Sequence, residues 1–350
     1  MKKIILTGGG TGGHVVPALA LVESLKKENY DIHYIGSKKG IEVELVKGLP
    51  YYPISTGKLR RYLDLENVTD LLRTVKGVGE AVGLMRKIKP HVVFSKGGFV
   101  SVPVVIAAKL CRVPVVVHES DMTCGLANKI AIPLAKVVCT GFEGAEVPSQ
   151  KAVYTGTPIR EDLFKGDLHK GAQLMRFTQQ KPVLTIMGGS GGSAILNQVV
   201  REALPKLTPH FNLIHLCGKD NVEKALDSGG YKQLAFASEA LPHLLAMTEL
   251  MITRGGANAL AEILALKKPS LIIPLSKKAS RGDQIDNANN FKKHGYSLVL
   301  EEDQLTADIL FDQVMVLQRN KSKLMSAMAE AKASDGVQKI VAIIKANTKD

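Results

Sequence analysis

Short runs of aliphatic and β-branched residues alternate with segments of helical periodicity along almost the whole chain. The runs lie at 3–7, 31–36, 91–95 and 113–118, and then at 182–187, 212–217, 250–253 and 269–275. Continuous apolar runs separated by amphipathic helices are typical of parallel strands that are covered on both faces. The pattern therefore predicts an α/β fold with parallel sheets.

The same local pattern opens both halves of the chain. A strand, a glycine-rich turn and an amphipathic helix are predicted at 6–25, where the turn reads GGTGGH, and again at 186–204, where it reads GGSGGS. Such a repeat indicates two Rossmann-like domains. We place them at 1–162 and 163–335, and we expect a helix at about 336–350 to pack back on the first domain.

Length and composition narrow the class of protein. A chain of 350 residues exceeds what one hydrophobic core usually organises, which agrees with two domains. The net charge of +13 favours partners that carry phosphate, such as nucleotides, nucleic acids or anionic lipids. Aromatic residues make up only 5% and Trp is absent, so platforms for stacking bases are poorly supplied and we expect no nucleic-acid partner.

Nothing in the sequence predicts secretion or a membrane span. Cys111, Cys124, Cys139 and Cys217 lie far apart and form no CxxC pair, which indicates reduced thiols in the cytoplasm. The apolar run after Met1 is too short for a signal sequence, and no run approaches ~18 apolar residues. Any contact with a membrane is therefore expected to be peripheral.

The glycine-rich turns are candidate phosphate sites. Glycines at a strand-to-helix turn let a phosphate approach the backbone, and the N–H groups of the helix N-terminus favour its charge. Residues 8–13 also match GxGxxG, but the second strand ends in Gly36, Ser37 and Lys38, where a dinucleotide site needs an acid for the ribose. The sequence therefore favours phosphate binding over a nicotinamide cofactor. The alternative is that both turns only pack a helix on a strand.

Two further glycine turns follow predicted strands, SKGGFVSVP at 95–103 and TRGGANALAE at 253–262. In the second of these, Gly255 and Gly256 open a helix that carries Glu262 further along. A carboxylate at that position can accept two hydrogen bonds from a ribose. On spacing alone, Glu262 could equally be an acid on the helix surface.

A basic and apolar segment lies between the second and third predicted strands of the first domain. It begins with GKLRRYL at 57–63 and continues as a helical pattern with apolar residues at Val68, Leu71, Leu72, Val75 and Val78. The basic residues among them are Lys58, Arg60, Arg61, Arg73 and Lys76. Apolar residues ringed by basic ones suit an anionic membrane interface. The alternative is an ordinary apolar stripe that packs against the sheet.

Several motifs occur together in the order and spacing of one known family. They are GGGTGGHVVPALAL, SKGGFVSVP, HESD, TPIR, MGGSGGSAILNQ, TRGGANALAE and DQIDNAN, and they extend over nearly the whole chain. Through these motifs the sequence resembles the MurG family of UDP-N-acetylglucosamine:lipid I N-acetylglucosaminyltransferases. The resemblance implies a GT-B fold, in which two Rossmann-like domains face a cleft. It places the donor nucleotide mainly on the C-terminal domain and the acceptor on the N-terminal one.

The resemblance also implies roles for individual residues. His14 is the expected base for the acceptor hydroxyl, and Glu119 is the alternative. The expected donor contacts are Thr11, Gly12, Gly13, Arg160, Ser190, Ala237, Ala257, Asn258, Ala259, Glu262 and Gln284. The expected contacts with the acceptor diphosphate are Gly9, Gly10, Gly97 and Gly98.

The implied reaction is a single displacement. The C4 hydroxyl of lipid-linked N-acetylmuramyl-pentapeptide attacks the anomeric carbon, UDP leaves and the configuration inverts. The sequence has no DxD element and no cluster of His, Cys and carboxylates, so no metal and no cofactor are expected. The resemblance implies a peripheral enzyme at the cytoplasmic face of the plasma membrane. Its partners would be UDP-N-acetylglucosamine, lipid I, an anionic membrane surface and a cell-wall synthesis complex.

Several positions depart from the pattern of the better-known Gram-negative members. Phe99 stands where Tyr is common, and Asp121 stands where Asn is common. The turn GGSGGS lacks the usual Gln after its first serine, and the loop at 275–284 is longer. These differences concern the sugar end of the donor site more than the nucleotide end.

Two other classes of protein stay open. Another GT-B protein, such as a diacylglycerol glucosyltransferase or a UDP-N-acetylglucosamine 2-epimerase, would share the nucleotide half. A basic nucleic-acid-binding protein is permitted by the charge. The turns GGTGGH and SKGGFVS favour the MurG-like reaction over its GT-B rivals.

Overall fold

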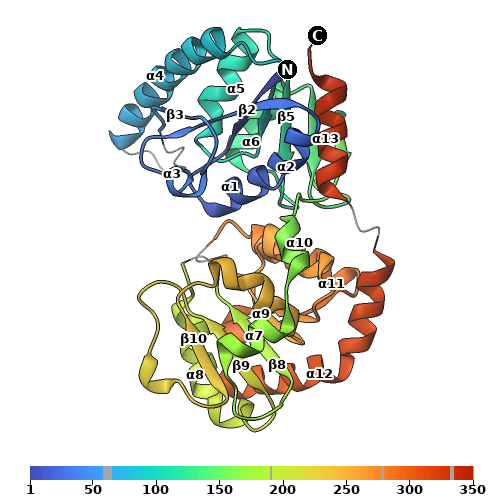
Figure 1. Cartoon of the computed structure of the whole chain (residues 1–350). Helices are drawn as coiled ribbons and strands as arrows, with labels where there is room; N and C mark the ends of the chain where they lie inside the picture. The colour runs from blue at the N-terminus through green and yellow to red at the C-terminus, as the bar shows by residue number, and fades with distance from the viewer. Residues whose placement is uncertain (58–64, 190, 278–279, 332–334, 350) are drawn as a thin grey trace. The chain divides into compact units, whose positions relative to one another are not determined.

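The computed structural model describes residues 1–57, 65–189, 191–277, 280–331 and 335–349. The chain forms two compact units, Met1–Arg160 with Ser334–Asp350, and Glu161–Ala333. Each unit contains one parallel sheet with helices on both faces, as Figure 1 shows. The predicted α/β fold with parallel sheets is therefore confirmed.

The first unit has a seven-stranded sheet in the order β3-β2-β1-β4-β5-β6-β7, and its neighbouring strands are parallel. Its strands are β1 (Lys2–Thr7), β2 (Tyr30–Ser37), β3 (Tyr51–Ile54), β4 (Val92–Ser95), β5 (Val115–Glu119), β6 (Val137–Thr140) and β7 (Ala152–Tyr154). Its helices are α1 (Gly12–Leu19), α2 (Val22–Lys27), α3 (Glu42–Leu45), α4 (Leu65–Ile88), α5 (Ser101–Leu110), α6 (Leu126–Ala131) and α13 (Gly336–Asn347).

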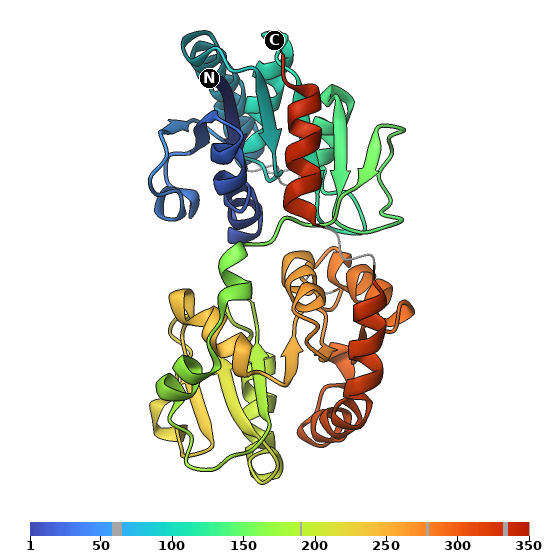
Figure 2. The ribbon, with the colours of Figure 1, turned by 45° about the vertical axis from the view of Figure 1, so that its right-hand side comes forward.

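Both faces of this sheet are buried, which explains its continuous apolar strands. Side chains alternate between faces along a strand, so Ile5 and Val93 pack against α4 and α5, while Ile4 and Val92 point the other way. The second face is covered by α1, α2 and the C-terminal α13, whose Ile340 is fully buried. Figures 1 and 2 show α13 along the side of the sheet opposite α4.

The second unit has a six-stranded parallel sheet in the order β10-β9-β8-β11-β12-β13. Its strands are β8 (Val183–Met187), β9 (Asn212–Leu216), β10 (Tyr231–Leu234), β11 (Leu250–Thr253), β12 (Ser270–Ile272) and β13 (Ser297–Val299). Its helices are α7 (Leu168–Met175), α8 (Ala194–Leu207), α9 (Leu241–Met247), α10 (Ala257–Ala265), α11 (Asp283–Lys293) and α12 (Ala307–Glu330). Helices α8 and α12 pack on one face, and α7 and α9 on the other.

Five short 3-10 helices lie among the described residues. They are η1 (Ile132–Leu134), η2 (Glu161–Lys165), η3 (Lys224–Leu226), η4 (Ser238–Ala240) and η5 (Glu302–Gln304).

Candidate active site

The four glycine turns follow the strands at the two points where strand order reverses. In the first unit the order reverses between β1 and β4, and in the second between β8 and β11. The turns at 8–13 and 96–98 follow the first pair of strands, and those at 188–193 and 254–256 follow the second. Ligands of open parallel sheets bind beyond the carboxyl ends of strands at such points. Each unit therefore carries one candidate binding site.

The two turns of the first unit are in direct contact. A Cβ added at Gly98 would lie 2.3 Å from the Gly9 carbonyl oxygen and 2.9 Å from Cδ2 of His14. A Cβ added at Gly10 would lie 2.5 Å from the Phe99 ring. Gly98 and Gly10 also have positive φ angles of 80° and 88°, which L side chains rarely adopt. The structure thus brings together His14 and the glycines predicted at the acceptor side.

Helices α1 and α10 begin at glycine turns without a side-chain cap. Thr11 precedes α1 and Gly256 precedes α10. No side-chain hydrogen bond from either residue caps its helix. A Cβ added at Gly12 or Gly256 would meet nothing within 4 Å. Packing within the protein therefore gives no reason for glycine at these two positions. A ligand that binds beside the first N–H groups of each helix would explain these glycines.

The first glycine turn rests on a buried carboxylate. Glu42 is fully buried and accepts hydrogen bonds from the N–H of Gly10 at 3.2 Å and of Ser37 at 3.0 Å. The Tyr34 hydroxyl donates to the Gly8 carbonyl at 2.8 Å, and burial, reinforced by Glu42, raises the pKa of that phenol. Hydrogen bonds with Tyr34 and Glu42 therefore hold the turn at Gly8 and at Gly10. The Gly10 N–H, predicted at the acceptor diphosphate, already has an acceptor inside the protein.

Glu119, at the end of β5, is also engaged by its own loop. Its carboxylate is 4% exposed and accepts from the N–H of Asp121 at 3.1 Å and of Gly125 at 2.9 Å. Asn128 Nδ2 donates to the same carboxylate at 3.0 Å. Three donors hold this side chain in the loop between β5 and α6.

The second glycine turn of the first unit begins with a buried cation. Lys96 is 1% exposed and its Nζ donates to the Ser120 hydroxyl. Burial lowers the pKa of this ammonium to about 8, against the opposing effect of Glu119 and Asp121. His118 is buried beside it, and burial, reinforced by Lys96, holds the pKa of its ring well below the usual range. The neutral ring bonds through Nε2 to the Gly156 carbonyl at 2.9 Å, so Nε2 carries the proton.

Lys96→Met should change the pH dependence of stability. Below about pH 8 the folded and unfolded chains both carry this proton, but between about 8 and 10.5 only the unfolded chain does. The free energy of unfolding of the wild-type protein therefore rises with pH across that window. We expect the variant to be more stable than wild type by about 1–3 kcal/mol at pH 7 and to lose this advantage toward pH 10.5.

Urea unfolding at pH 7 and at pH 10.5 measures this difference in stability. Lys109→Met, at the exposed end of α5, is the control. An Lys96→Met advantage of the same size at both pH values would contradict the assignment.

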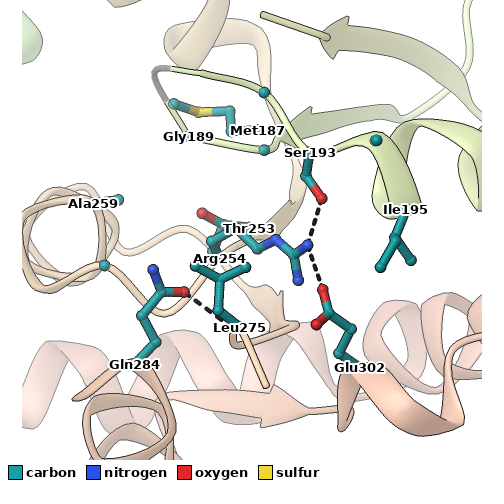
Figure 3. Close-up of a pocket in the computed structure, with 14 residues that line it drawn as sticks. Met187, Gly189, Ser193, Ile195, Thr253, Arg254, Ala259, Leu275, Gln284 and Glu302 are labelled. Carbon is teal, nitrogen blue, oxygen red and sulfur yellow. Dashed lines mark hydrogen bonds and ion pairs between the residues drawn. The ribbon is translucent and has the colours of Figure 1, made fainter. Parts of the chain in front are cut away.

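The second unit contains a cavity of about 390 Å³ at its reversal point, called here the second-unit cavity. Its lining includes Gly188, Gly189, Gly192, Ser193, Arg254, Gly256, Ala259, Leu275, Gln284 and Glu302. Figure 3 shows that these residues come from both glycine turns, from α10, from Leu275 after β12, from the start of α11 and from η5. The cavity therefore combines the two turns of the second unit.

Arg254 ties the walls of the second-unit cavity together. Its guanidinium pairs with Glu302 at 2.6 Å, and the two side chains are 7% and 6% exposed. It also donates to the Ser193 hydroxyl, the cap of α8, and to the Ile273 carbonyl at 3.0 Å. In Figure 3 the guanidinium points toward both Ser193 and Glu302. One buried cation thus connects the turn after β8, the turn after β11 and η5.

Two side chains of α11 fix the turn at Gly255. Gln284 Oε1 accepts from the N–H of Gly255 and of Leu275, both at 3.2 Å, and Asn287 Nδ2 donates to the Gly255 carbonyl at 3.0 Å. A Cβ at Gly255 would lie 2.4 Å from the backbone carbonyl oxygen of Gln284, so only glycine fits there. Since the side-chain oxygen of Gln284 is used inside the protein, the side-chain nitrogen is the atom left for a ligand.

The comparisons with known proteins agree with this architecture. Residues 4–140 match the glycosyltransferase family 28 N-terminal domain, and residues 183–342 match the glycosyltransferase family 28 C-terminal domain. A Clostridium tetani protein named UDP-N-acetylglucosamine--N-acetylmuramyl-(pentapeptide) pyrophosphoryl-undecaprenol N-acetylglucosamine transferase is 50% identical over 98% of each chain. The crystal structure of Acinetobacter baumannii MurG is 25% identical, with a TM-score of 0.77 over 99% of this chain and 100% of that one.

The chain belongs to the MurG family. A Clostridium botulinum protein of the same name as the C. tetani relative is 50% identical over the full length of both chains. The glycotransferase of kitacinnamycin shares the fold, with 14% identity and a TM-score of 0.76 over 99% of each chain. The predicted GT-B fold is therefore confirmed.

The donor contacts expected from the MurG resemblance lie in both units. Ala259 and Gln284 line the second-unit cavity. Ala257, Asn258 and Glu262 lie on the same helix as Ala259. Ala237 precedes η4, Arg160 is the last residue of the first unit's main segment, and Thr11, Gly12 and Gly13 open α1. Ser190 lies outside the described residues.

Neither a metal site nor a membrane-spanning helix occurs among the described residues of this MurG-family chain. Across the described ranges, no three His, Cys, Asp or Glu side chains are placed to hold a metal ion. Within the same part of the chain, no helix is long and apolar enough to cross a membrane.

Proposed function

We propose that this protein transfers N-acetylglucosamine from UDP-N-acetylglucosamine to the C4 hydroxyl of lipid-linked N-acetylmuramyl-pentapeptide, with inversion and without a metal. The observation that carries the proposal is 50% identity, over nearly full length, to relatives named for this transfer. One candidate site in each unit suits a reaction with two substrates.

The donor is proposed to bind in the second unit. The N–H groups at the start of α10 and the turn at 188–193 would receive the diphosphate, with Ser190 and Arg160 as further contacts. Glu262 would accept hydrogen bonds from the ribose, the backbone at Ala237 and Ala257 would hold the uracil, and Gln284 would contact the sugar. Arg254 would act by holding both turns in place, since both of its terminal nitrogens bond to groups inside the protein.

The acceptor is proposed to bind in the first unit, with His14 as the base. His14 lies in the first turn of α1, and its imidazole is a side chain of the type that serves as a general base. Its ring lies against the second glycine turn at Gly98. The three hydrogen bonds that Glu119 accepts from its own loop favour His14 over Glu119 for this role.

Glu262→Ala should weaken donor binding and leave acceptor binding unchanged. A hydrogen bond to a charged group contributes ~1.5–3 kcal/mol, which corresponds to about 10- to 150-fold in donor affinity. Steady-state kinetics with each substrate varied in turn measure the effect. Asp286→Ala, at an exposed acid on α11, is the matched control. An unchanged donor KM in Glu262→Ala would show that this carboxylate is only a helix-surface acid.

A peripheral position at the cytoplasmic face of the plasma membrane is proposed on the surface of α4. Leu71, Leu72 and Val75 are 63%, 65% and 61% exposed, so this apolar stripe does not pack against the sheet. Arg73 and Lys76 are exposed beside them. Exposed apolar residues among cations suit an anionic lipid surface, and a cell-wall synthesis complex would act at the same surface. Residues 58–63 and the side chain of Val68, which belong to the same prediction, lie outside the described residues.

The rival functions are separated by their substrates. An epimerase acts on UDP-N-acetylglucosamine alone, whereas the proposed transferase needs an acceptor. A nucleic-acid-binding protein would shift a DNA or RNA probe in a gel, with an affinity that falls steeply with salt. We expect neither activity.

A further inference from the structure

The first unit contains a second large cavity, separate from the second-unit cavity and called here the first-unit cavity. It has a volume of about 910 Å³. Two of its lining residues, Gly10 and Phe99, belong to the glycine turns, and Ser55 and Thr56 follow β3. Its charged lining residues are Lys38, Lys39, Asp70, Arg73 and Lys76.

The charge of this cavity is positive after its ion pairs are counted. Arg73 pairs with Asp70 at 3.3 Å, and Lys38 lies 3.7 Å from Glu80. Four cations face these two acids and Glu42, which bonds to Gly10, so the excess is one positive charge. In the part of the chain that the structure describes, Lys39 and Lys76 have no acid within ion-pair distance. The cavity is therefore suited to an anionic ligand.

The glycine turn beside the cavity is poorly suited to hold that charge by itself. The Gly10 N–H is bonded to the carboxylate of Glu42, which is fully buried behind the turn. A Cβ at Gly9 would lie 2.7 Å from the same carboxyl group, so this acid lies directly against the turn. An anion at Gly10 needs cations in front of it to offset Glu42, and the residues that line the cavity supply them.

The position of the cavity on the unit matches the order of groups in a lipid-linked sugar. Gly10, at one side, belongs to the same turn as His14, where the sugar hydroxyl would react. Helix α4 forms the other side, and at 3.6 residues per turn Arg73 and Lys76 lie on the flank between its buried face and Leu72. Leu72 is among the exposed apolar residues that would reach the bilayer. Sugar, phosphate and lipid would then follow one another across this surface.

We propose that the first-unit cavity binds the diphosphate of the lipid-linked acceptor through Lys39 and Lys76. The proposal rests on the proposed function, and it places the diphosphate contacts outside the glycine motifs. An anionic phospholipid headgroup carries the same phosphate chemistry, so the experiment has to separate the two sources.

The test is the double variant Lys39→Gln/Lys76→Gln, assayed with a lipid I analogue that carries a short prenyl chain, in detergent that contains no anionic lipid. Loss of two ionic contacts should raise the acceptor KM by about 10- to 100-fold, with the donor KM and the saturating kcat within a few-fold of wild type. Salt should raise the wild-type acceptor KM more than that of the variant, because exposed charges are screened. Lys27→Gln/Lys87→Gln is the matched control, since these lysines are exposed on α2 and α4 and do not line the cavity.

Two results would overturn the proposal. The first is an acceptor KM equal in the two double variants while the wild-type protein transfers sugar, and this result would leave the proposed function intact. In that case, weaker sedimentation of the Lys39/Lys76 variant with phosphatidylglycerol vesicles, but not with phosphatidylcholine vesicles, would assign the cavity to a membrane headgroup. The second is a wild-type protein that transfers nothing, which would overturn the proposed function together with this site.

Discussion

His14→Ala is expected to lower kcat by about 10²–10⁴ with a smaller effect on the donor KM. The reason is that the acceptor hydroxyl has to lose its proton as it attacks the anomeric carbon. The His14 imidazole at the start of α1 is the side chain proposed to accept it. Steady-state kinetics with both substrates varied measure the effect.

A packing role for His14 predicts a different result. Its ring lies against the second glycine turn, so loss of the ring could also loosen that contact. The variant would then show a lower melting temperature or a raised acceptor KM, with a saturating rate within a few-fold of wild type. A thermal melt beside the kinetics separates the two accounts. A nearly intact saturating rate would exclude His14 as the base and return Glu119 to consideration.

Glu302→Ala is expected to destabilise the second unit by about 3–5 kcal/mol. The variant leaves the Arg254 guanidinium buried at 7% exposure without the carboxylate that lies 2.6 Å away. It also removes the acceptor of the Ser276 N–H. Hydrogen exchange of the amides in β8 and β11 reports the loss locally, which is needed because two units can unfold separately.

Asp308→Ala provides the control for this prediction. Its partner is Lys206, and the two side chains are 76% and 52% exposed, so loss of this pair should cost less than about 1 kcal/mol. Replacing both partners, as Arg254→Met with Glu302→Leu, should recover much of the stability lost in Glu302→Ala. Equal exchange rates in Glu302→Ala and Asp308→Ala would contradict the role given to the buried pair.

The sequence predicts the central strands of this fold better than its edges. Strands β1, β4, β8 and β11 are covered on both faces, and each appears in the sequence as a continuous apolar run. The edge strand β10 reads YKQL with alternating burial, and β7 has only three residues. Edge strands carry too little apolar pattern to separate them from loops.

The glycine turns could be predicted, but the side chains that support them could not. The hydrogen bond between Gly10 and Glu42 joins residues 32 positions apart, and the one between Arg254 and Ser193 joins residues 61 positions apart. No local pattern encodes such pairs. Lys96, Arg254 and Asn287 belong to motifs named in the sequence, whereas Glu42 and Glu302 had no signal of their own.

The surface of α4 shows a second limit of sequence patterns. The spacing of Leu71, Leu72 and Val75 predicts an apolar face, but the pattern is the same whether that face is covered or open. Only the structure shows these side chains to be exposed.

The most direct test of the account is transfer of labelled N-acetylglucosamine from the UDP donor to a lipid I analogue, with UDP release and the configuration of the product measured together. The account predicts one UDP released for each sugar transferred, a β-linked product from the α-linked donor, and no turnover of the donor without acceptor. Turnover of UDP-N-acetylglucosamine alone, or an α-linked product, would contradict it.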